Sequence, residues 1–193
     1  MNLKAKTTLF VALALSLLGF SSASLAGGSL DLSLSNYAFR VGYDATHARS
    51  NLHLGASWLH HEDEGDMGTL GLHVVDTRPG ARNVYVGVGV MAHIADLALW
   101  EETAGGVGVG GFARYAIPAN RDFSLAGYAY YGPSVLAFED TKNLINTDFR
   151  FQYSPIPTAR IYIGYRYVSF KQEGYRKRYE LADGGHGGIS IDF

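Results

Sequence analysis

Residues 184–193 read Gly-Gly-His-Gly-Gly-Ile-Ser-Ile-Asp-Phe, and this stretch decides the fold class. In an extended chain, Ile189, Ile191 and Phe193 share one face, while polar residues and glycine occupy the other. Such period-two alternation predicts a β-strand with one apolar and one polar face. An aromatic residue at the end of such a strand suits the membrane–water boundary of a transmembrane β-barrel. We therefore interpret these three residues as a membrane-insertion signature.

The first 26 residues have the pattern of a secretory signal peptide. Two lysines precede an apolar run at residues 9–20, which is followed by small residues and Ser24-Leu25-Ala26. The run is short for a bilayer-spanning helix, so we predict cleavage after Ala26 rather than a permanent anchor. Residues 27–193 then form one domain. The sequence contains no cysteine, which suits a chain exported to an oxidising compartment without disulfides.

Composition favours a β-barrel over a helical membrane protein. Charged residues make up 18% of the sequence, which also contains 24 glycines and 13 tyrosines. The best apolar stretch after the signal, residues 84–100, is interrupted by His93 and Asp96, so it does not predict a spanning helix. A barrel explains this mixture because half of its strand residues face lipid and half face a polar lumen. The formal net charge of −2 gives no sign of a nucleic-acid partner.

The same alternation recurs along the chain and predicts a series of strands. From Asn51 onward these strands are residues 51–60, 69–76, 83–93, 107–117, 122–131, 147–153, 160–170 and 184–193. Residues 29–45 alternate too, and bacterial barrels avoid odd strand numbers. We interpret residues 27–46 as a short hairpin or first strands, which gives ten strands, or as a segment outside an eight-stranded wall.

The fold class expected is therefore all-β: a small antiparallel transmembrane β-barrel of eight to ten strands with meander topology. A soluble β-sandwich would show similar alternation, but the aromatic end and the many tyrosines favour the barrel. Connections alternate in length, and in barrels of this type the short ones are periplasmic. We predict short turns at residues 78–82, 118–121 and 154–158. We predict long extracellular loops at residues 60–66, 95–106, 132–143 and 171–185.

Several stretches resemble the YfaZ family of bacterial outer-membrane proteins. They are residues 29–35 (SLDLSLS), 59–63 (LHHED), 70–76 (LGLHVVD), 164–166 (GYR) and 183–188 (DGGHGG). The end at Phe193 also resembles the C-terminal signature of outer-membrane proteins. The resemblance implies a location in the bacterial outer membrane, among its lipid and lipopolysaccharide, and insertion by the barrel-assembly machinery. It supplies no catalytic residues to carry over.

The densest group of chemically active side chains lies in the first predicted long loop. It consists of His60, His61, Glu62, Asp63 and Asp66. Such residues could hold a divalent cation, or could act as a base with its orienting acid. Their spacing matches no defined metal motif, and a charged loop that stays out of lipid is the simpler interpretation. We predict no metal and no cofactor.

A second group of charged residues falls on the predicted inward faces. It consists of Arg114, Asp148, Arg150, Arg160, Arg166 and Asp192. Isolated charges would be costly in a narrow lumen, so we expect a paired network that fills the interior. An eight-stranded barrel has room only for its own side chains. Ten strands would make an ion-selective lining more plausible.

A basic loop completes the candidates. Arg176, Lys177 and Arg178 lie between the last two predicted strands and could contact lipopolysaccharide phosphates, since arginine pairs bidentately with phosphate. A flexible basic loop without a partner is the alternative.

These observations predict a monomeric outer-membrane β-barrel with a largely filled lumen and a structural or surface-interaction role. It is not expected to be an enzyme, since the sequence contains neither G-x-S-x-G nor H-E-x-x-H. One alternative is a narrow porin-like channel for ions or small solutes. Another is a rim-sited hydrolase or acyltransferase that uses His60, His61 and Asp63.

Overall fold

The structure is a computed structural model that describes residues 25–47, 51–76, 83–98 and 102–193. The predicted signal peptide lies, up to residue 24, outside the described residues, and so does the turn predicted at residues 78–82. Within the described ranges, no helix is long and apolar enough to cross a membrane.

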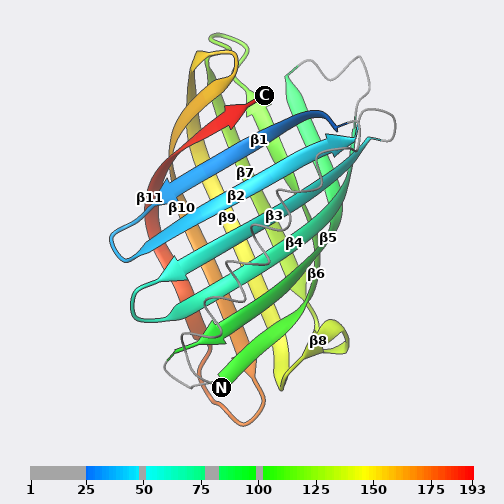
Figure 1. The fold of residues 1–193 in the computed structure, drawn as a ribbon, viewed down its shortest axis with the longest axis vertical. Coiled ribbons are helices and arrows are strands. Elements are labelled where there is room, and N and C mark those ends of the chain that lie inside the picture. Colours follow the sequence, from blue (N-terminus) through cyan, green and yellow to red (C-terminus); the bar gives the residue numbers. More distant parts are fainter. Residues whose placement is uncertain (1–24, 48–50, 77–82, 99–101) are drawn as a thin grey trace.

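Ten long antiparallel strands form the wall of a barrel (Figure 1). They are β1 (Leu25–Leu34), β2 (Ala38–His47), β3 (Leu52–His61), β4 (Gly65–Val75), β5 (Val84–Leu97), β6 (Glu102–Ala116), β7 (Phe123–Gly132), β9 (Thr141–Ile156), β10 (Ala159–Gln172) and β11 (Tyr179–Asp192). A 3-10 helix, η1 (Ser134–Leu136), and a two-residue strand, β8 (Ala137–Phe138), lie between β7 and β9. β8 pairs with β6 at Gly105 and Gly106.

The barrel closes through the pairing of β1 with β11. Every other pair joins strands that follow one another along the chain, from β1–β2 to β10–β11, with β8 outside the wall. Gly28 and Phe193 exchange backbone hydrogen bonds of 2.8 and 2.9 Å at one end of the closing seam, and Leu34 faces Gly187 at the other. The predicted all-β meander barrel is confirmed, with ten strands. Residues 27–46 belong to the wall as parts of β1 and β2.

The two ends of the barrel carry different connections. We call the end at which Gly28 pairs with Phe193 the terminal end, and the opposite end, with the turns at residues 35–37, 62–64 and 173–178, the distal end. All four connections predicted as extracellular lie at the distal end. The predicted turns at residues 118–121 and 154–158 lie at the terminal end.

The distal connections are mostly shorter than predicted. β3 continues to His61 and β4 begins at Gly65, so the loop expected at residues 60–66 is a turn of three residues, 62–64. Gly65 has φ +112°, and a Cβ there would lie 2.0 Å from the backbone oxygen of Asp96. Glycine is therefore required where this turn enters β4.

Two further predicted loops are also mostly strand. β5 and β6 extend through residues 95–97 and 102–106, and β10 and β11 occupy much of residues 171–185. Near the distal end, inward positions such as Leu97 are apolar like the outward ones. The period-two pattern therefore disappears although the chain stays extended. For this reason the ends of these strands could not be predicted from the sequence.

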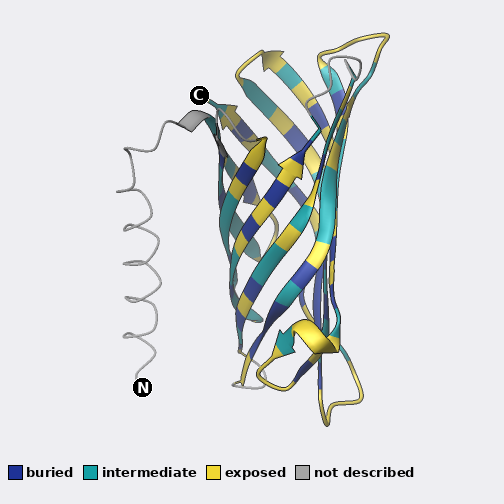
Figure 2. Cartoon of the chain, turned by 90° about the vertical axis from the view of Figure 1, so that its right-hand side faces the viewer, coloured by how far each residue is buried: buried dark blue, intermediate teal, exposed yellow. Residues whose placement is uncertain are grey.

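The wall is apolar outside and polar inside. Outward side chains such as Val88, Phe149 and Ile163 are 68%, 58% and 69% exposed. Inward side chains that are buried include His53, His73, His93, Asn146, Asp148, Arg150, Gln152, Arg166, His186 and Ser190. Buried and exposed residues alternate along the strands in Figure 2. The inward and outward faces expected from the alternation are those found.

Apolar side chains fill the lumen at the distal end. We call this cluster the distal plug; it consists of Leu59, Met67, Ala95, Leu97, Ala104, Leu144, Val168, Phe170, Tyr179, Leu181 and Ala182. Leu59, Leu97 and Phe170 are completely buried. The hydroxyl of Tyr179 donates to the backbone oxygen of Glu64 at 2.8 Å and so ties the plug to the β3–β4 turn.

Candidate functional site

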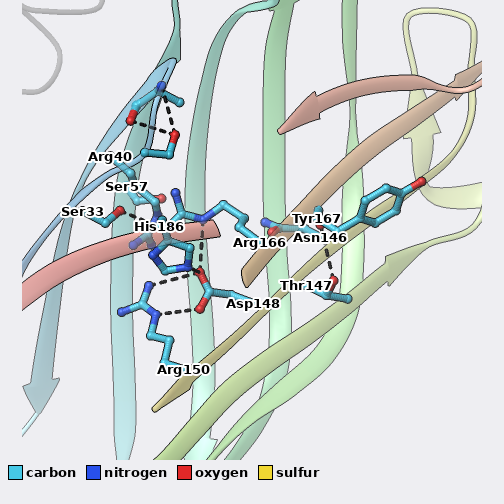
Figure 3. Close-up of polar contacts among 12 residues, drawn as sticks. Ser33, Arg40, Ser57, Asn146, Thr147, Asp148, Arg150, Arg166, Tyr167 and His186 are labelled. Atoms are coloured by element: carbon cyan, nitrogen blue, oxygen red, sulfur yellow. Dashed lines mark hydrogen bonds and ion pairs between the residues drawn. The ribbon is translucent and has the colours of Figure 1, made fainter. Parts of the chain in front are cut away.

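The middle of the lumen holds a buried charge network. Asp148 of β9, whose side chain is fully buried, accepts hydrogen bonds from Arg150 Nε at 2.6 Å and from Arg166 Nε at 3.1 Å. His186 Nε2 lies 3.1 Å from the same carboxylate. In Figure 3, these three side chains converge on Asp148 from β9, β10 and β11.

A second carboxylate joins this network from the other side of the closing seam. Asp31 of β1 accepts hydrogen bonds from Arg150 Nη1 at 2.8 Å, from Arg40 Nη1 at 2.9 Å and from the Tyr162 hydroxyl at 2.9 Å. The Arg150 guanidinium carbon also lies 4.3 Å from the centroid of the Tyr162 ring. We call Asp31, Arg40, Asp148, Arg150, Arg166 and His186 the central charge network.

The central charge network can exist in the lumen because its charges are paired. A buried charge without a partner costs several kcal/mol, whereas each carboxylate here receives hydrogen bonds from two arginines. The bonds join β1, β2, β9 and β10, and His186 adds β11. They therefore brace the barrel across its closing seam.

The remaining charged residues of the predicted network lie toward the terminal end. Arg160 pairs with Asp192 and also donates to Ser190 Oγ at 3.0 Å. Arg114 is placed differently, since its guanidinium carbon lies 5.4 Å from the centroid of the Tyr85 ring. Among the described residues, no carboxylate lies within 4.0 Å of Arg114. Five of the six predicted residues thus form two groups rather than one network, and Arg114 belongs to neither group.

Between the central charge network and the terminal end lies a cavity of about 510 Å³, which we call the terminal cavity. Its lining reaches Gly27 and Phe193 at the terminal end and Asp31 and Arg150 at its inner limit. A second cavity of about 350 Å³ lies at the same end of the barrel. Arg114, Arg160 and Asp192 line both.

Histidine and tyrosine side chains form hydrogen-bonded pairs on the wall of the terminal cavity. Asp44 Oδ1 lies 2.9 Å from His53 Nδ1, and His53 Nε2 lies 2.8 Å from the Tyr85 hydroxyl. His73 Nε2 lies 2.7 Å from the Tyr130 hydroxyl. Nearer the plug, His93 Nε2 lies 3.0 Å from Asn146 Nδ2. These pairs hold the rings that face the cavity.

The predicted loop cluster does not converge on one point. His60 Nδ1 lies 2.9 Å from Asp66 Oδ1, which also accepts from Trp58 Nε1 at 3.1 Å, and all three belong to the outward face. His61, as the next residue of β3, points to the other face, and its Nδ1 accepts from the backbone N–H of Glu64 at 3.1 Å.

Glu62 and Asp63 of the same cluster are exposed in the turn. Across the described ranges, no group of three or more histidine, cysteine, aspartate or glutamate side chains could hold a metal ion.

The basic residues of the last distal connection are not equivalent. Arg176 and Lys177 are exposed. Arg178 folds back onto the wall, where Nη1 donates to Asn143 Oδ1 at 2.6 Å and Nε donates to Ser169 Oγ at 3.1 Å. Only the first two therefore present their charge to the surroundings.

The predicted insertion signature lies on the outer surface of β11 and just beyond it. Ile189, Ile191 and Phe193 are 36%, 42% and 69% exposed. Ile189 and Ile191 pair with β1 on one side and β10 on the other, at the closing seam.

Residues 5–193 match the model of a protein family described as YfaZ precursor. The chain belongs to the YfaZ family. This confirms the resemblance expected from the sequence, and no curated protein matches the chain. The YfaZ chain is thus a ten-stranded barrel with a plugged distal end, a charged middle and a cavity at the terminal end.

Sequence reasoning missed several polar residues of this YfaZ barrel. Asp31, Arg40 and His186 were not predicted as network members, and neither were the pairs on the cavity wall. The alternation of β1 and β11 places Asp31 and His186 on the polar face, so the sequence does indicate that both side chains point into the lumen. It did not identify their partners, which lie on distant strands.

The terminal cavity offers chemical groups that can recognise a ligand. The terminal cavity presents arginine guanidinium groups, tyrosine hydroxyls and imidazole rings, which bind anions and stack on planar groups. The hydroxyls of Tyr85 and Tyr130 are engaged with the rings of His53 and His73 in the pairs described above.

Proposed function

We propose that this YfaZ-family protein is a small outer-membrane β-barrel that does not conduct ions or solutes and has a structural or surface-interaction role rather than an enzymatic one. The observation that carries the proposal is the reversed distribution of side chains, with apolar residues outside and charged residues inside. A water-soluble barrel or sandwich would bury its apolar face. A lipid-facing barrel needs this arrangement.

Aromatic side chains on the outer surface support the membrane assignment. Near the terminal end, Phe123 lies against Tyr153, with ring centroids 5.0 Å apart, and Tyr43 lies 6.2 Å from Phe193. Near the distal end, the rings of Phe39 and Trp58 meet edge to face at 5.1 Å. Two aromatic belts of this kind mark the interfaces of outer-membrane barrels.

The family description and the chain's N-terminal pattern agree with an exported protein. The word precursor in that description accords with the signal peptide predicted at residues 1–26. In the proposed orientation the terminal end faces the periplasm and the distal end faces the exterior. Arg176 and Lys177 then reach the level of lipopolysaccharide phosphates, and Ile189, Ile191 and Phe193 are available to the barrel-assembly machinery.

Two successive blocks support a lumen that does not conduct. The distal plug fills one end with apolar side chains, and below it the central charge network lies on the lumen side of five neighbouring strands, β9, β10, β11, β1 and β2. An apolar constriction excludes water and therefore ions. The barrel acts in this proposal through its surface, not through a pore.

A narrow channel is the second candidate, and the terminal cavity favours it. Ten strands leave about 510 Å³ at one end of the lumen, so only the plug and the network separate the two sides. The rim-sited enzyme has less support, because His60 and His61 point to opposite faces of β3.

Single-channel conductance of the refolded mature protein in a planar bilayer tests the proposal. A heat-modifiable gel band first establishes that the barrel has formed. We expect a folded protein without discrete openings. Steady openings would replace the proposal by the channel, and failure to insert into lipid would remove the membrane assignment.

Lipopolysaccharide contact is tested separately. We expect the double substitution of Arg176 and Lys177 by glutamine to weaken binding to lipopolysaccharide vesicles, because each basic residue loses a charge-assisted bond to phosphate. Arg121→Gln, which changes an exposed charge near the terminal end, is the matched control. Equal weakening in both would show non-specific attraction.

A further inference from the structure

The terminal cavity contains a cation that has no carboxylate partner among the residues that the structure describes. Four arginines and three aspartates line this cavity, namely Arg40, Arg114, Arg150, Arg160, Asp31, Asp44 and Asp192. The carboxylates are occupied: Asp31 by Arg40 and Arg150, Asp192 by Arg160, and Asp44 by the ring of His53. Arg114 alone of the four arginines has no such bond within the part of the chain that the structure describes.

Arg114 lies on the side of the cavity that is open to the terminal end. It lines both the terminal cavity and the second cavity at the same end, together with Arg160 and Asp192. The side chain of Asp192 is 37% exposed, so solvent reaches this level of the lumen. The distal plug closes the other end. Access to Arg114 is therefore from the terminal end.

One aromatic ring lies against the guanidinium of Arg114, and further rings continue from it along the cavity. Tyr85 lies beneath Arg114, and the Phe112 ring lies 5.5 Å from Tyr85 and 5.5 Å from His73. Tyr128 lines the same cavity, with its ring 5.9 Å from that of Tyr130. Flat rings of this kind pack against planar, apolar groups. A volume of about 510 Å³ lies within the range of small-molecule sites.

We infer that the terminal cavity binds a small organic anion, whose carboxylate or phosphate group pairs with Arg114 and whose planar apolar body packs against Tyr85, Phe112 and Tyr128. A guanidinium in a partly dry site binds such a group through two parallel hydrogen bonds. That the cavity faces the periplasm depends on the proposed function. The binding itself does not, since it needs only the folded barrel.

Calorimetry on the full mature barrel in detergent micelles tests this inference with four small probes. Benzoate and phenyl phosphate carry both the acidic group and the ring, benzamide lacks the charge, and inorganic phosphate lacks the ring. We expect benzoate and phenyl phosphate to bind. The affinities of benzamide and inorganic phosphate should be lower by about tenfold or more. Equal binding of benzamide would overturn the role of Arg114, and equal binding of inorganic phosphate would overturn the role of the rings.

Pairs of variants distinguish binding of the probe in the terminal cavity from its uptake by the detergent micelle. We expect Arg114→Gln to weaken benzoate binding about tenfold or more, while Arg176→Gln, which removes an exposed charge at the distal end, leaves it unchanged. Gly55→Leu fills the cavity from another strand, and its Cβ meets no atom closer than 3.4 Å, so it is expected to fold and to abolish binding. Gly68→Leu, with open space around its Cβ, is the matched control.

A heat-modifiable band shows that each variant is folded before its affinity is compared. Unchanged affinity in folded Arg114→Gln or folded Gly55→Leu would overturn the inference, and so would a folded wild type that binds no probe. Conductance measurements bear on the proposed function independently. A silent barrel that binds no probe would leave that function standing and remove the ligand site.

Discussion

Arg150 Nη1 donates a 2.8 Å hydrogen bond to Asp31 Oδ2 across the lumen, although 119 positions separate the two residues along the chain. Arg150 lies on β9 and Asp31 on β1, and in the sheet these strands are separated by β10 and β11. The bond therefore does not follow the wall. It crosses the lumen and links the first strand of the barrel to the late ones, which makes the charged middle a brace for the seam.

Asp148 holds the two arginines that reach across the seam, Arg150 to Asp31 and Arg166 to Ser33, and its removal tests the structural role of the network. We expect Asp148→Asn to lower the free energy of unfolding by about 3–5 kcal/mol, because Arg150 and Arg166 lose a buried charge partner. Urea titration in micelles measures the loss. Asp122→Asn, in an exposed turn, is the control and should change little; similar values for both would mean that the network does not brace the barrel.

The distal plug should depend on its largest completely buried side chain. Phe170 is completely buried, so Phe170→Ala leaves a cavity and is expected to cost about 3–5 kcal/mol of unfolding free energy. Phe149→Ala removes the same group from the outer surface, where the ring is 58% exposed and no internal cavity forms. We expect a smaller loss there by urea titration. The reverse order would show that the distal end is loosely packed.

A charge on the outer wall distinguishes a lipid-facing surface from a water-facing one. We expect Ile163→Arg, on an outward position well inside β10 that is 69% exposed, to cost about 2–4 kcal/mol of folding free energy in lipid vesicles. Val84→Arg, at the first residue of β5 and also on the outer face, should cost about 0–1 kcal/mol because it lies at the end of the strand. In a water-soluble barrel both substitutions would be nearly neutral.

The proposed orientation can be read by thiol labelling, since the sequence contains no cysteine. In intact cells we expect a membrane-impermeant maleimide to modify Lys177→Cys, in an exposed distal connection, and to leave Asn120→Cys, at the terminal end, unmodified. Permeabilised cells should label both. Labelling of Asn120→Cys alone in intact cells would reverse the orientation, and the terminal cavity would then face the exterior.

Much of the wall could be predicted from the sequence. Successive side chains on a strand point to opposite faces, so the face that a residue occupies depends only on whether its position along the strand is odd or even. Leu54 and Phe149 on the outer face and His53 and Asp148 on the inner face follow directly from period two. The strand ends near the plug could not be predicted in this way. There the inner face carries Leu59, Leu97 and Phe170, so apolar residues occupy both faces and the alternation vanishes.

The loop cluster and the charged lumen show the same limit for the site. His60 and His61 are adjacent in sequence but lie on opposite faces of β3. The closeness of the histidines and carboxylates along the chain therefore did not bring them together in space. Arg114 and Arg150 share an inward direction, yet one is paired with two carboxylates and the other with none among the described residues.

The sequence by itself determined that the chain forms amphipathic strands and which side chains turn inward, because these properties are local to each strand. Only the tertiary structure decided the closure of β1 on β11, the number ten, and the contacts across the lumen. Those depend on how far the wall curves before its edges meet, and no local pattern encodes that distance. The plug at one end and the cavity lined by Arg114 at the other exist only once the barrel has closed.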